Sequence, residues 1–269
     1  MIATETQARE AAQAYRQRNT LGVAPLGDLV ALIEHNENVD VAILDGPPDA
    51  HGLTAKDPER NAVIVAATRT PNPMRQRSTL AHELGHITFG DHTPENNREW
   101  SARSPQEIRA DAFARHLLIP LEGLVAHIEA APDRTMRVEP ALLSAIVQEY
   151  KVSPHLVVIQ LTEAGYITNS EKHRIAGSLT APMLAARFGW TDQYTTWQEE
   201  SLRRRAPQKL LARANDAYEQ GLLPALFVAR LRAISEADLV DQYEKAGVAT
   251  PPPIVTEDDP DEFLPPGVL

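Results

Sequence analysis

Hydrophobic residues recur at helical spacing through most of the chain, with one interval of strand-like runs near the start. Residues 3–18 and 26–35 have helical patterns, the second with Leu26, Leu29, Leu32 and Ile33 on one side. Three short apolar runs follow, separated by turn-rich breaks, and they predict strands at residues 39–44, 52–55 and 62–67. Helical periodicity then returns and continues to about residue 246. This order predicts an α+β fold, with a short three-stranded sheet followed by a mostly α-helical C-terminal region.

The second half of the chain begins with two predicted helices joined by a tight turn. They run from Pro140 to Tyr150 and from Pro154 to Ala164, which gives a helix-turn-helix outline. Residues 179–246 contain further helical patterns. The hydrophobic residues predicted to form the core of that region are Leu211, Leu222, Leu223, Phe227, Leu231 and Leu239.

We therefore predict four parts of the chain. Residues 1–130 form the first domain, residues 131–170 a helix-turn-helix-like segment, and residues 171–248 a helical C-terminal domain. Residues 249–269 combine five acidic residues with six prolines, so we expect this tail to be disordered.

One predicted helix carries a metal-binding pattern. Asn72-Pro73 is typical of a helix start, and His82 and His86, four positions apart, lie on one face of the helix with Glu83 beside them. The apolar stripe on the other side consists of Leu80, Leu84 and Ile87. Two imidazoles that can reach one zinc ion, with an adjacent glutamate as base, are the centre of a metal-dependent hydrolase. The alternative is an amphipathic helix whose polar face carries these residues without a metal.

A zinc hydrolase needs a third protein ligand, and Glu107 is the first candidate. It lies on a helix predicted to start at Ser104-Pro105, and Asp111, four residues later on the same face, could hold a ligating histidine by its second ring nitrogen. Ser104 and Glu107 also have the spacing of a capping box, in which the carboxylate would turn back to its own helix.

His92 is the second candidate for the third ligand. It follows His86 by six residues, the interval of a longer zinc-protease motif that has a glycine three residues after the second histidine. Here that position is Phe89, which does not readily supply the turn that a glycine allows. The residues alone favour Glu107 as the third ligand. They leave open two alternatives, that His92 is the third ligand or that neither residue binds the metal.

Composition narrows the classes of function. The net charge of −11 repels phosphate backbones, and the absence of cysteine excludes thiolate zinc ligands and a cysteine nucleophile. Residues 1–18 lack the apolar stretch of a signal peptide, and the chain has no run approaching the roughly 20 apolar residues of a membrane span. We expect a cytoplasmic protein without a membrane partner.

DNA binding and non-catalytic sensing are the competing functions. The second helix of the helix-turn-helix outline contains no Arg or Lys, so phosphate and guanine contacts are missing there. A basic run at residues 203–213 has the pattern of a solvated helix face, and Trp190 and Trp197 are expected in a core. A degenerate sensor is disfavoured because the metal-binding pattern is intact.

Two segments resemble the signature blocks of the ImmA/IrrE-type metallopeptidases, in the same order. They are Arg77–His86, with the H-E-x-x-H pattern, and Glu107–Pro120, with an E-x-x-A-D-x-F-A pattern. The resemblance extends from the strands near Val39 to about Thr168. It implies a zincin-like, gluzincin-like metallopeptidase domain in which Glu107 is the third zinc ligand, and Asp111 fills the block's polar position.

The resemblance also implies a function. Members are intracellular zinc peptidases, several of which relieve repression by cutting a helix-turn-helix repressor in phage, mobile-element or stress circuits. We accordingly expect Zn²⁺, with Mn²⁺ as the alternative, held by His82, His86 and Glu107, and Glu83 as the catalytic base. The expected partner is a repressor protein as substrate, without direct DNA binding.

Two further expectations concern the reaction. The strand at Gly52–Ala55 could bind an extended peptide by strand addition. The donor that would stabilise the oxyanion is left open among His51, His92, His116 and nearby arginines, because no tyrosine occurs between residues 17 and 149. His116 lies nine positions after Glu107, about half a turn out of phase, and is expected to face away from the metal.

Overall fold

A computed structural model describes residues 2–47, 52–57, 62–91, 104–130, 138–175 and 177–248. By their contacts, the residues form two compact units, Met1–Arg205 and Ala206–Leu269. Within the described residues, no helix is long and apolar enough to cross a membrane.

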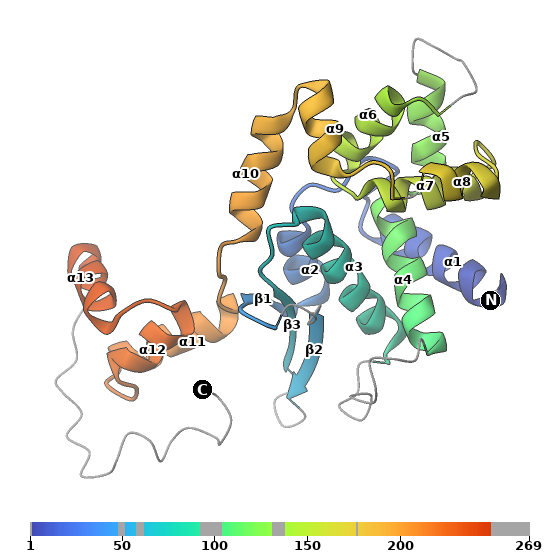
Figure 1. Ribbon diagram of the computed structural model, residues 1–269. Coiled ribbons are helices and arrows are strands. Elements are labelled where there is room, and N and C mark those ends of the chain that lie inside the picture. Colours follow the sequence, from blue (N-terminus) through green and yellow to red (C-terminus); the bar gives the residue numbers. More distant parts are fainter. Residues whose placement is uncertain are drawn as a thin grey trace. The chain divides into compact units, whose positions relative to one another are not determined.

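The first unit has an α+β fold, with one small sheet and helices on either side of it in the sequence (Figure 1). Its elements up to the sheet are α1 (Ile2–Arg18), α2 (Leu29–Glu37), β1 (Asp40–Leu44), β2 (Gly52–Asp57) and β3 (Ala62–Thr68). After the sheet come α3 (Pro73–Phe89), α4 (Pro105–Leu118), α5 (Leu121–Ala130), α6 (Pro140–Tyr150), α7 (Pro154–Glu163), α8 (Asn169–Ile175), α9 (Ala181–Phe188) and α10 (Thr191–Ser201). The predicted three strands and the two helices of the helix-turn-helix outline are confirmed to within two residues.

The sheet has the order β1-β3-β2. β1 is parallel to β3, with Val41 opposite Val65, and β2 is antiparallel to β3, with Thr54 opposite Val65. The outer edge of β1 is covered by the segment after α10, because Ile43 N donates to Arg205 O at 2.8 Å and Arg205 N donates to Ile43 O at 3.0 Å. Among the described residues, the outer edge of β2 has no strand paired to it.

Helix α4 packs against both α1 and α3, and this layer forms the centre of the first unit (Figure 1). Tyr15, Leu84, Phe113 and Leu117 are fully buried there. The buried Arg16 fixes α1 to the end of α4, since its guanidinium donates to the carbonyls of Leu117, Gly22 and Ala24. Burial lowers the pKa of Arg16 to about 10, which still leaves it charged near neutral pH.

Helices α6 to α10 contribute to this same hydrophobic core. Ile146, Leu161, Leu184 and Trp190 belong to it, and Trp190 Nε1 donates to Ser144 Oγ at 2.9 Å. Trp190 and Trp197 are buried, as predicted. The boundaries predicted after residues 130 and 170 therefore fall inside one compact unit, and the four-part division remains a prediction about domain organisation.

The second unit contains α11 (Gln208–Glu219), α12 (Ala225–Arg232) and α13 (Glu236–Ala246). Its buried centre is formed by Ala214, Tyr218, Val228, Ala229, Leu239 and Tyr243. Leu239 was predicted correctly, and Leu211, Leu223 and Leu231 pack against this centre. The acidic tail at residues 249–269 lies outside the described residues.

Two core predictions in the second unit are wrong. Leu222 is 67% exposed because it follows Gly221, whose φ of 71° turns the chain after α11. Phe227 is 36% exposed because the short α12 turns the next two residues, Val228 and Ala229, towards the buried centre.

Candidate metal centre

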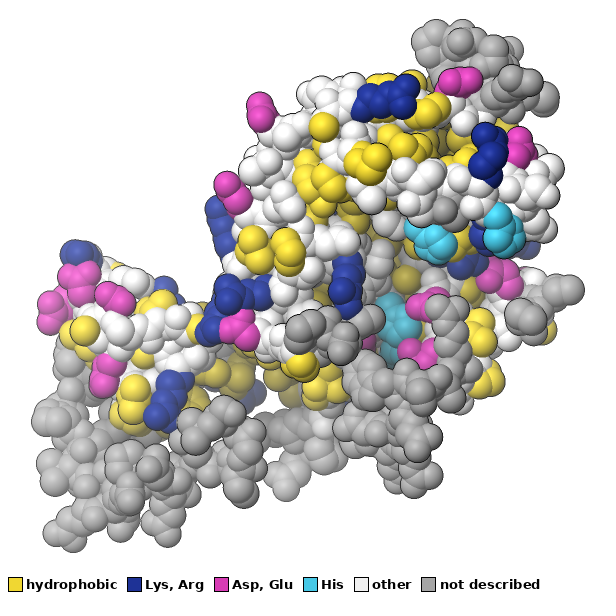
Figure 2. Space-filling view, in the orientation of Figure 1, with side chains coloured by type: hydrophobic (Ala, Val, Ile, Leu, Met, Phe, Trp, Pro, Cys, Tyr) yellow, Lys and Arg dark blue, Asp and Glu magenta, His cyan; other side chains and the backbone are white. Residues whose placement is uncertain are grey.

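Helices α3 and α4 bring three potential metal ligands together. His82 Nε2 lies 3.1 Å from Glu107 Oε2, and His86 Nε2 lies 3.3 Å from Glu107 Oε1. The two Nε2 atoms are 3.0 Å apart. Figure 2 shows histidine and acidic side chains together on the surface over these helices. The helical spacing of the two histidines places them on one face of α3, and α4 brings the sequence-distant Glu107 to the same point.

The local sequence explains how each helix begins. Asn72 caps α3 by accepting a hydrogen bond from Arg75 N, and Pro73 occupies the first turn. Ser104 caps α4 by accepting one from Glu107 N at 3.2 Å. The hydrogen bond from Glu107 N to Ser104 is one of the two interactions of the predicted capping box. The Glu107 carboxylate does not turn back to its own helix but points to the two imidazoles.

The second ring nitrogens of both histidines are held by carboxylates. His82 Nδ1 lies 2.9 Å from Asp111 Oδ1, and His86 Nδ1 lies 2.8 Å from Asp91 Oδ1. A carboxylate only accepts hydrogen bonds, so each Nδ1 is the donor and each neutral imidazole presents a lone pair at Nε2. Two such lone pairs and the Glu107 carboxylate face one another, which is favourable when a metal ion, or a proton on an imidazole, lies between them. Two imidazole nitrogens and one carboxylate are a donor set that fits zinc.

The pKa values of His82, His86 and Glu107 also favour positive charge at this site. Burial disfavours the charged form of His82, but hydrogen bonds to Asp111 and Glu107 outweigh it and raise the pKa of His82 to about 10. Burial likewise opposes charge on His86, whose pKa is raised by Glu107 and Asp91. Hydrogen bonds from both imidazoles hold the pKa of Glu107 well below its usual range.

Glu83 lies beside the histidines and is almost completely buried, at 7% exposure. Thr54 Oγ1 on β2 donates to Glu83 Oε2 at 2.8 Å. Gly52, on the same strand, is so close that an added Cβ would lie 2.5 Å from Glu83 Oε1. Burial raises the pKa of Glu83, and the Thr54 hydrogen bond opposes the rise. A carboxylate with a raised pKa is suited to accept a proton near neutral pH.

A peptidase-family model described as the IrrE N-terminal-like domain matches residues 36–162. This range includes the whole sheet, α3, α4, the three candidate ligands and Glu83. This part of the chain belongs to the ImmA/IrrE-type metallopeptidase family. The three-stranded sheet with its following helices is accordingly a zincin-like metallopeptidase domain. A comparison with curated proteins gives no match.

Family membership supports a metallopeptidase that uses a metal ion. The roles of His82, His86 and Glu107 as ligands, of Glu83 as base and of Asp111 behind His82 remain predictions. His92, the alternative ligand, and His51 lie outside the described residues. Sequence reasoning missed Asp91 and Arg109, and it did not connect Gly52 and Thr54 with Glu83. The only signal for Asp91 is its place directly after Gly90, which ends α3 in the left-handed conformation with φ 68°.

His116 faces away from the candidate ligands of the IrrE-type domain, as expected. It is buried, and its Nε2 lies 2.8 Å from Glu5 Oε1 on α1. Glu163 and Arg115 complete this cluster, with Arg115 paired to both Glu5 and Glu163. Because the Arg115 guanidinium already supplies the positive charge, the cluster is an ion-pair network that joins α1, α4 and α7.

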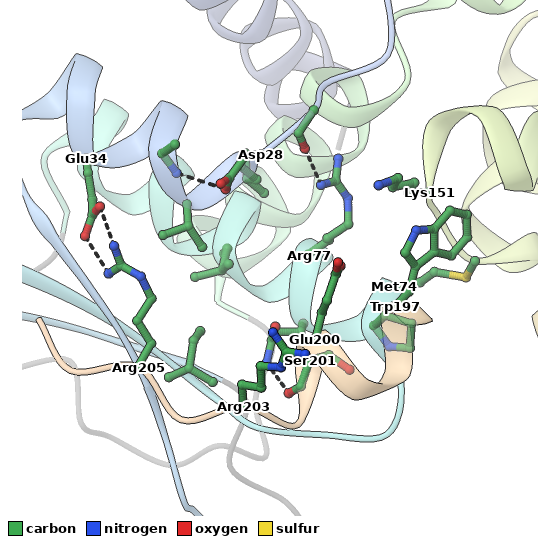
Figure 3. A pocket seen from close by; sticks show the side chains of 18 of the residues that line it. Asp28, Glu34, Met74, Arg77, Lys151, Trp197, Glu200, Ser201, Arg203 and Arg205 are labelled. Atoms are coloured by element: carbon green, nitrogen blue, oxygen red, sulfur yellow. Dashed lines mark hydrogen bonds and ion pairs between the residues drawn. The ribbon is translucent and has the colours of Figure 1, made fainter. Parts of the chain in front are cut away.

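A cavity of about 670 Å³ lies away from the histidines, between α2, the first half of α3 and the end of α10 (Figure 3). Several cations line it, and at least three of them have partners. Arg205 binds Glu34 through two contacts of 2.7 Å, Arg77 donates to backbone carbonyls of residues 26 and 27, and Lys151 lies 4.9 Å from the Trp197 ring centre. This cavity contains none of the candidate metal ligands, so it is separate from the candidate metal centre.

Proposed function

We propose that this protein is a site-specific, zinc-dependent peptidase that cleaves a helix-turn-helix transcriptional repressor. Cleavage would relieve repression in a phage, mobile-element or stress circuit. The observation that carries the proposal is the convergence of three acceptor groups beside the buried Glu83, inside an IrrE-type domain. In this proposal His82, His86 and Glu107 hold the metal.

The metal and the residues around it would have separate roles in the reaction. Zinc supplies Lewis acidity and makes water a usable nucleophile near neutral pH. Glu83 accepts the proton of the attacking water and passes it to the leaving amine. Asp111 and Asp91 keep both imidazoles in the tautomer that presents Nε2 to the metal. A carboxylate ligand also suits harder ions, so Mn²⁺ is the alternative metal.

The arrangement of the sheet favours a substrate that binds in an extended conformation. The edge of β1 is paired with Arg205, whereas the outer edge of β2 has no paired strand in the described part of the chain. Gly52 and Thr54 of β2 contact Glu83, so a peptide added to this edge would run past the base. Flexible segments of a repressor can adopt such an extended conformation.

The charge of the chain supports a protein substrate rather than DNA. Helix α7, the second helix of the helix-turn-helix outline, contains no Arg or Lys, and the net charge is −11. Control of transcription would then require another protein that does bind DNA. We place recognition of that repressor on residues from about 139 onwards, and we expect slow turnover of generic substrates such as casein.

The test uses the purified full chain and the helix-turn-helix repressor encoded beside it. We expect a single cut that a chelator abolishes and that Glu83→Gln slows by about a hundredfold or more, because the substitution removes the base but leaves the ligands. Glu83→Gln should retain its metal. Glu129→Gln, an exposed change on α5, is the matched control and should cleave normally. Binding to duplex DNA at physiological salt without cleavage of a repressor would contradict the proposal and favour a DNA-binding or sensor protein.

A further inference from the structure

The carboxylate that holds His86 is itself held by an arginine. Asp91 Oδ1 lies 2.8 Å from His86 Nδ1, and Arg109 Nη2 donates to the other carboxylate oxygen, Asp91 Oδ2, at 2.7 Å. The Asp91 side chain is only 15% exposed, whereas that of Asp111, which holds His82, is 51% exposed. The two histidines of the candidate centre are therefore supported unequally.

Arg109 is fixed in place by more than this ion pair. Its guanidinium lies over the ring of Phe89, 4.1 Å from the ring centre, in the last turn of α3. Phe89 packs edge-on against the buried Phe113, with ring centres 5.9 Å apart. A guanidinium stacked on an aromatic ring and bound to a carboxylate loses much of its freedom before any metal binds.

The pair also links the two elements that carry the candidate ligands. Asp91 directly follows the end of α3, and its backbone N donates to His86 O at 3.1 Å. Arg109 lies on α4, two residues after Glu107. The contact between Asp91 and Arg109 thus joins the segment of His86 to the helix of Glu107.

We infer that Asp91 and Arg109 are a positioning pair that fixes His86 relative to Glu107 and thereby sets the affinity of the site for its metal. The inference rests on the metal site of the proposed function. Carboxylates that hold ligating histidines contribute about 10–100-fold to metal affinity. Solvent competes for the exposed Asp111, so Asp91 contributes more than Asp111 does. Arg109 acts through Asp91, whose orientation it determines.

The first experiment measures zinc affinity by competition with a chromophoric chelator. Asp91→Ala should weaken zinc binding by about 10–100-fold, and Asp111→Ala by less. The Co²⁺ absorption spectrum should change in Asp91→Ala, because the His86 ring is no longer held. The metal-free variant should still unfold cooperatively, at a lower melting temperature because Arg109 loses its ion pair. If Asp91→Ala does not fold, Asp91→Asn, which keeps the size but removes the charge, takes its place and should also weaken binding.

The second experiment asks whether Arg109 acts through Asp91. Arg109→Gln should weaken zinc binding several-fold in the parent chain and add nothing in the Asp91→Ala background, with Arg109→Lys restoring part of the affinity. Equal losses in both backgrounds would overturn the coupling, and parent-like affinity in Asp91→Ala would overturn the inference. A parent protein that binds no zinc would instead refute the proposed function itself.

Discussion

Gly85 lies directly against Ala110 where α3 and α4 meet. A Cβ added to Gly85 would lie 3.1 Å from Ala110 Cα and 3.2 Å from Phe113 Cδ1. Gly85 stands between His82 and His86 on α3, and Ala110 lies three residues after Glu107 on α4. The missing side chain therefore lets the two helices approach closely at the point where the three candidate ligands converge.

Gly85→Ala should separate these helices and weaken metal binding. Alanine gains up to about 1 kcal/mol of helix propensity over glycine, which opposes the overpacking cost of about 1–3 kcal/mol. We expect little change in the free energy of unfolding of the metal-free protein, measured with urea, but about a tenfold lower zinc affinity. Ala110→Gly in the same chain should restore part of that affinity. Zinc binding at the parent level in Gly85→Ala would show that the close approach is unimportant.

The third ligand can be assigned by the metal content of purified variants. Glu107 Oε1 and Oε2 both face the imidazoles, so Glu107→Ala should lose most of the bound metal. His92→Ala should keep one ion per chain. The reverse pattern would make His92 the ligand, and retention of metal by both variants would mean that neither residue completes the site.

The helical part of the candidate centre could be predicted because its determinants are local. The spacing of His82 and His86 places both on one face of α3, and Asn72 and Pro73 fix where that helix begins. The same holds for Ser104 at the start of α4. These relationships span only a few residues, and helical geometry alone determines them.

The rest of the site depends on contacts between distant parts of the chain. Thr54 reaches Glu83 across 29 residues, and Arg109 reaches Asp91 across 18. No periodicity specifies which strand residue meets a given helix residue or which carboxylate meets a given imidazole. The same limit explains Leu222, whose exposure follows from the turn at Gly221 rather than from its own hydrophobicity.

The ion-pair network at Glu5 predicts a dependence of stability on pH. The hydrogen bond from His116, helped by Arg115 and opposed by burial, lowers the pKa of Glu5 from 4.5 to about 2. A carboxyl group whose pKa is lower in the folded than in the unfolded state stabilises the fold above its unfolded pKa. That stabilisation is lost as the pH falls through the folded pKa.

Glu5→Gln should therefore lower the melting temperature at pH 7, and the difference from the parent should shrink as the pH falls from about 4.5 towards 2. Thermal unfolding followed by circular dichroism across this range measures both effects. Glu10→Gln, an exposed change on the same helix, controls for the lost charge and should melt like the parent. A difference between Glu5→Gln and the parent that stays constant down to pH 2 would contradict the role given to this carboxylate.

Gly52→Ala tests whether β2 holds the proposed base. The new Cβ would lie 2.5 Å from Glu83 Oε1 and 2.6 Å from Thr79 Cγ2, distances that require a shift. Strand β2 is held by its pairing with β3, so the side chains of Glu83 and Thr79 on α3 are the groups that must move. The hydrogen bond from Thr54 to this glutamate would then be disturbed, while His82, His86 and Glu107 keep their positions.

We accordingly expect Gly52→Ala to bind zinc like the parent but to cleave the repressor about 10–100-fold more slowly, because misplacement of a general base costs part of its contribution of about 10²–10⁴-fold. The loss should appear in kcat, with KM nearly unchanged, since the backbone edge of β2 stays in place. Gly27→Ala is the matched control, because a Cβ there meets nothing within 4 Å, and it should cleave normally. A parent-like kcat in Gly52→Ala would show that β2 does not position Glu83. A loss of zinc together with activity would instead show that the substitution disturbs the metal ligands.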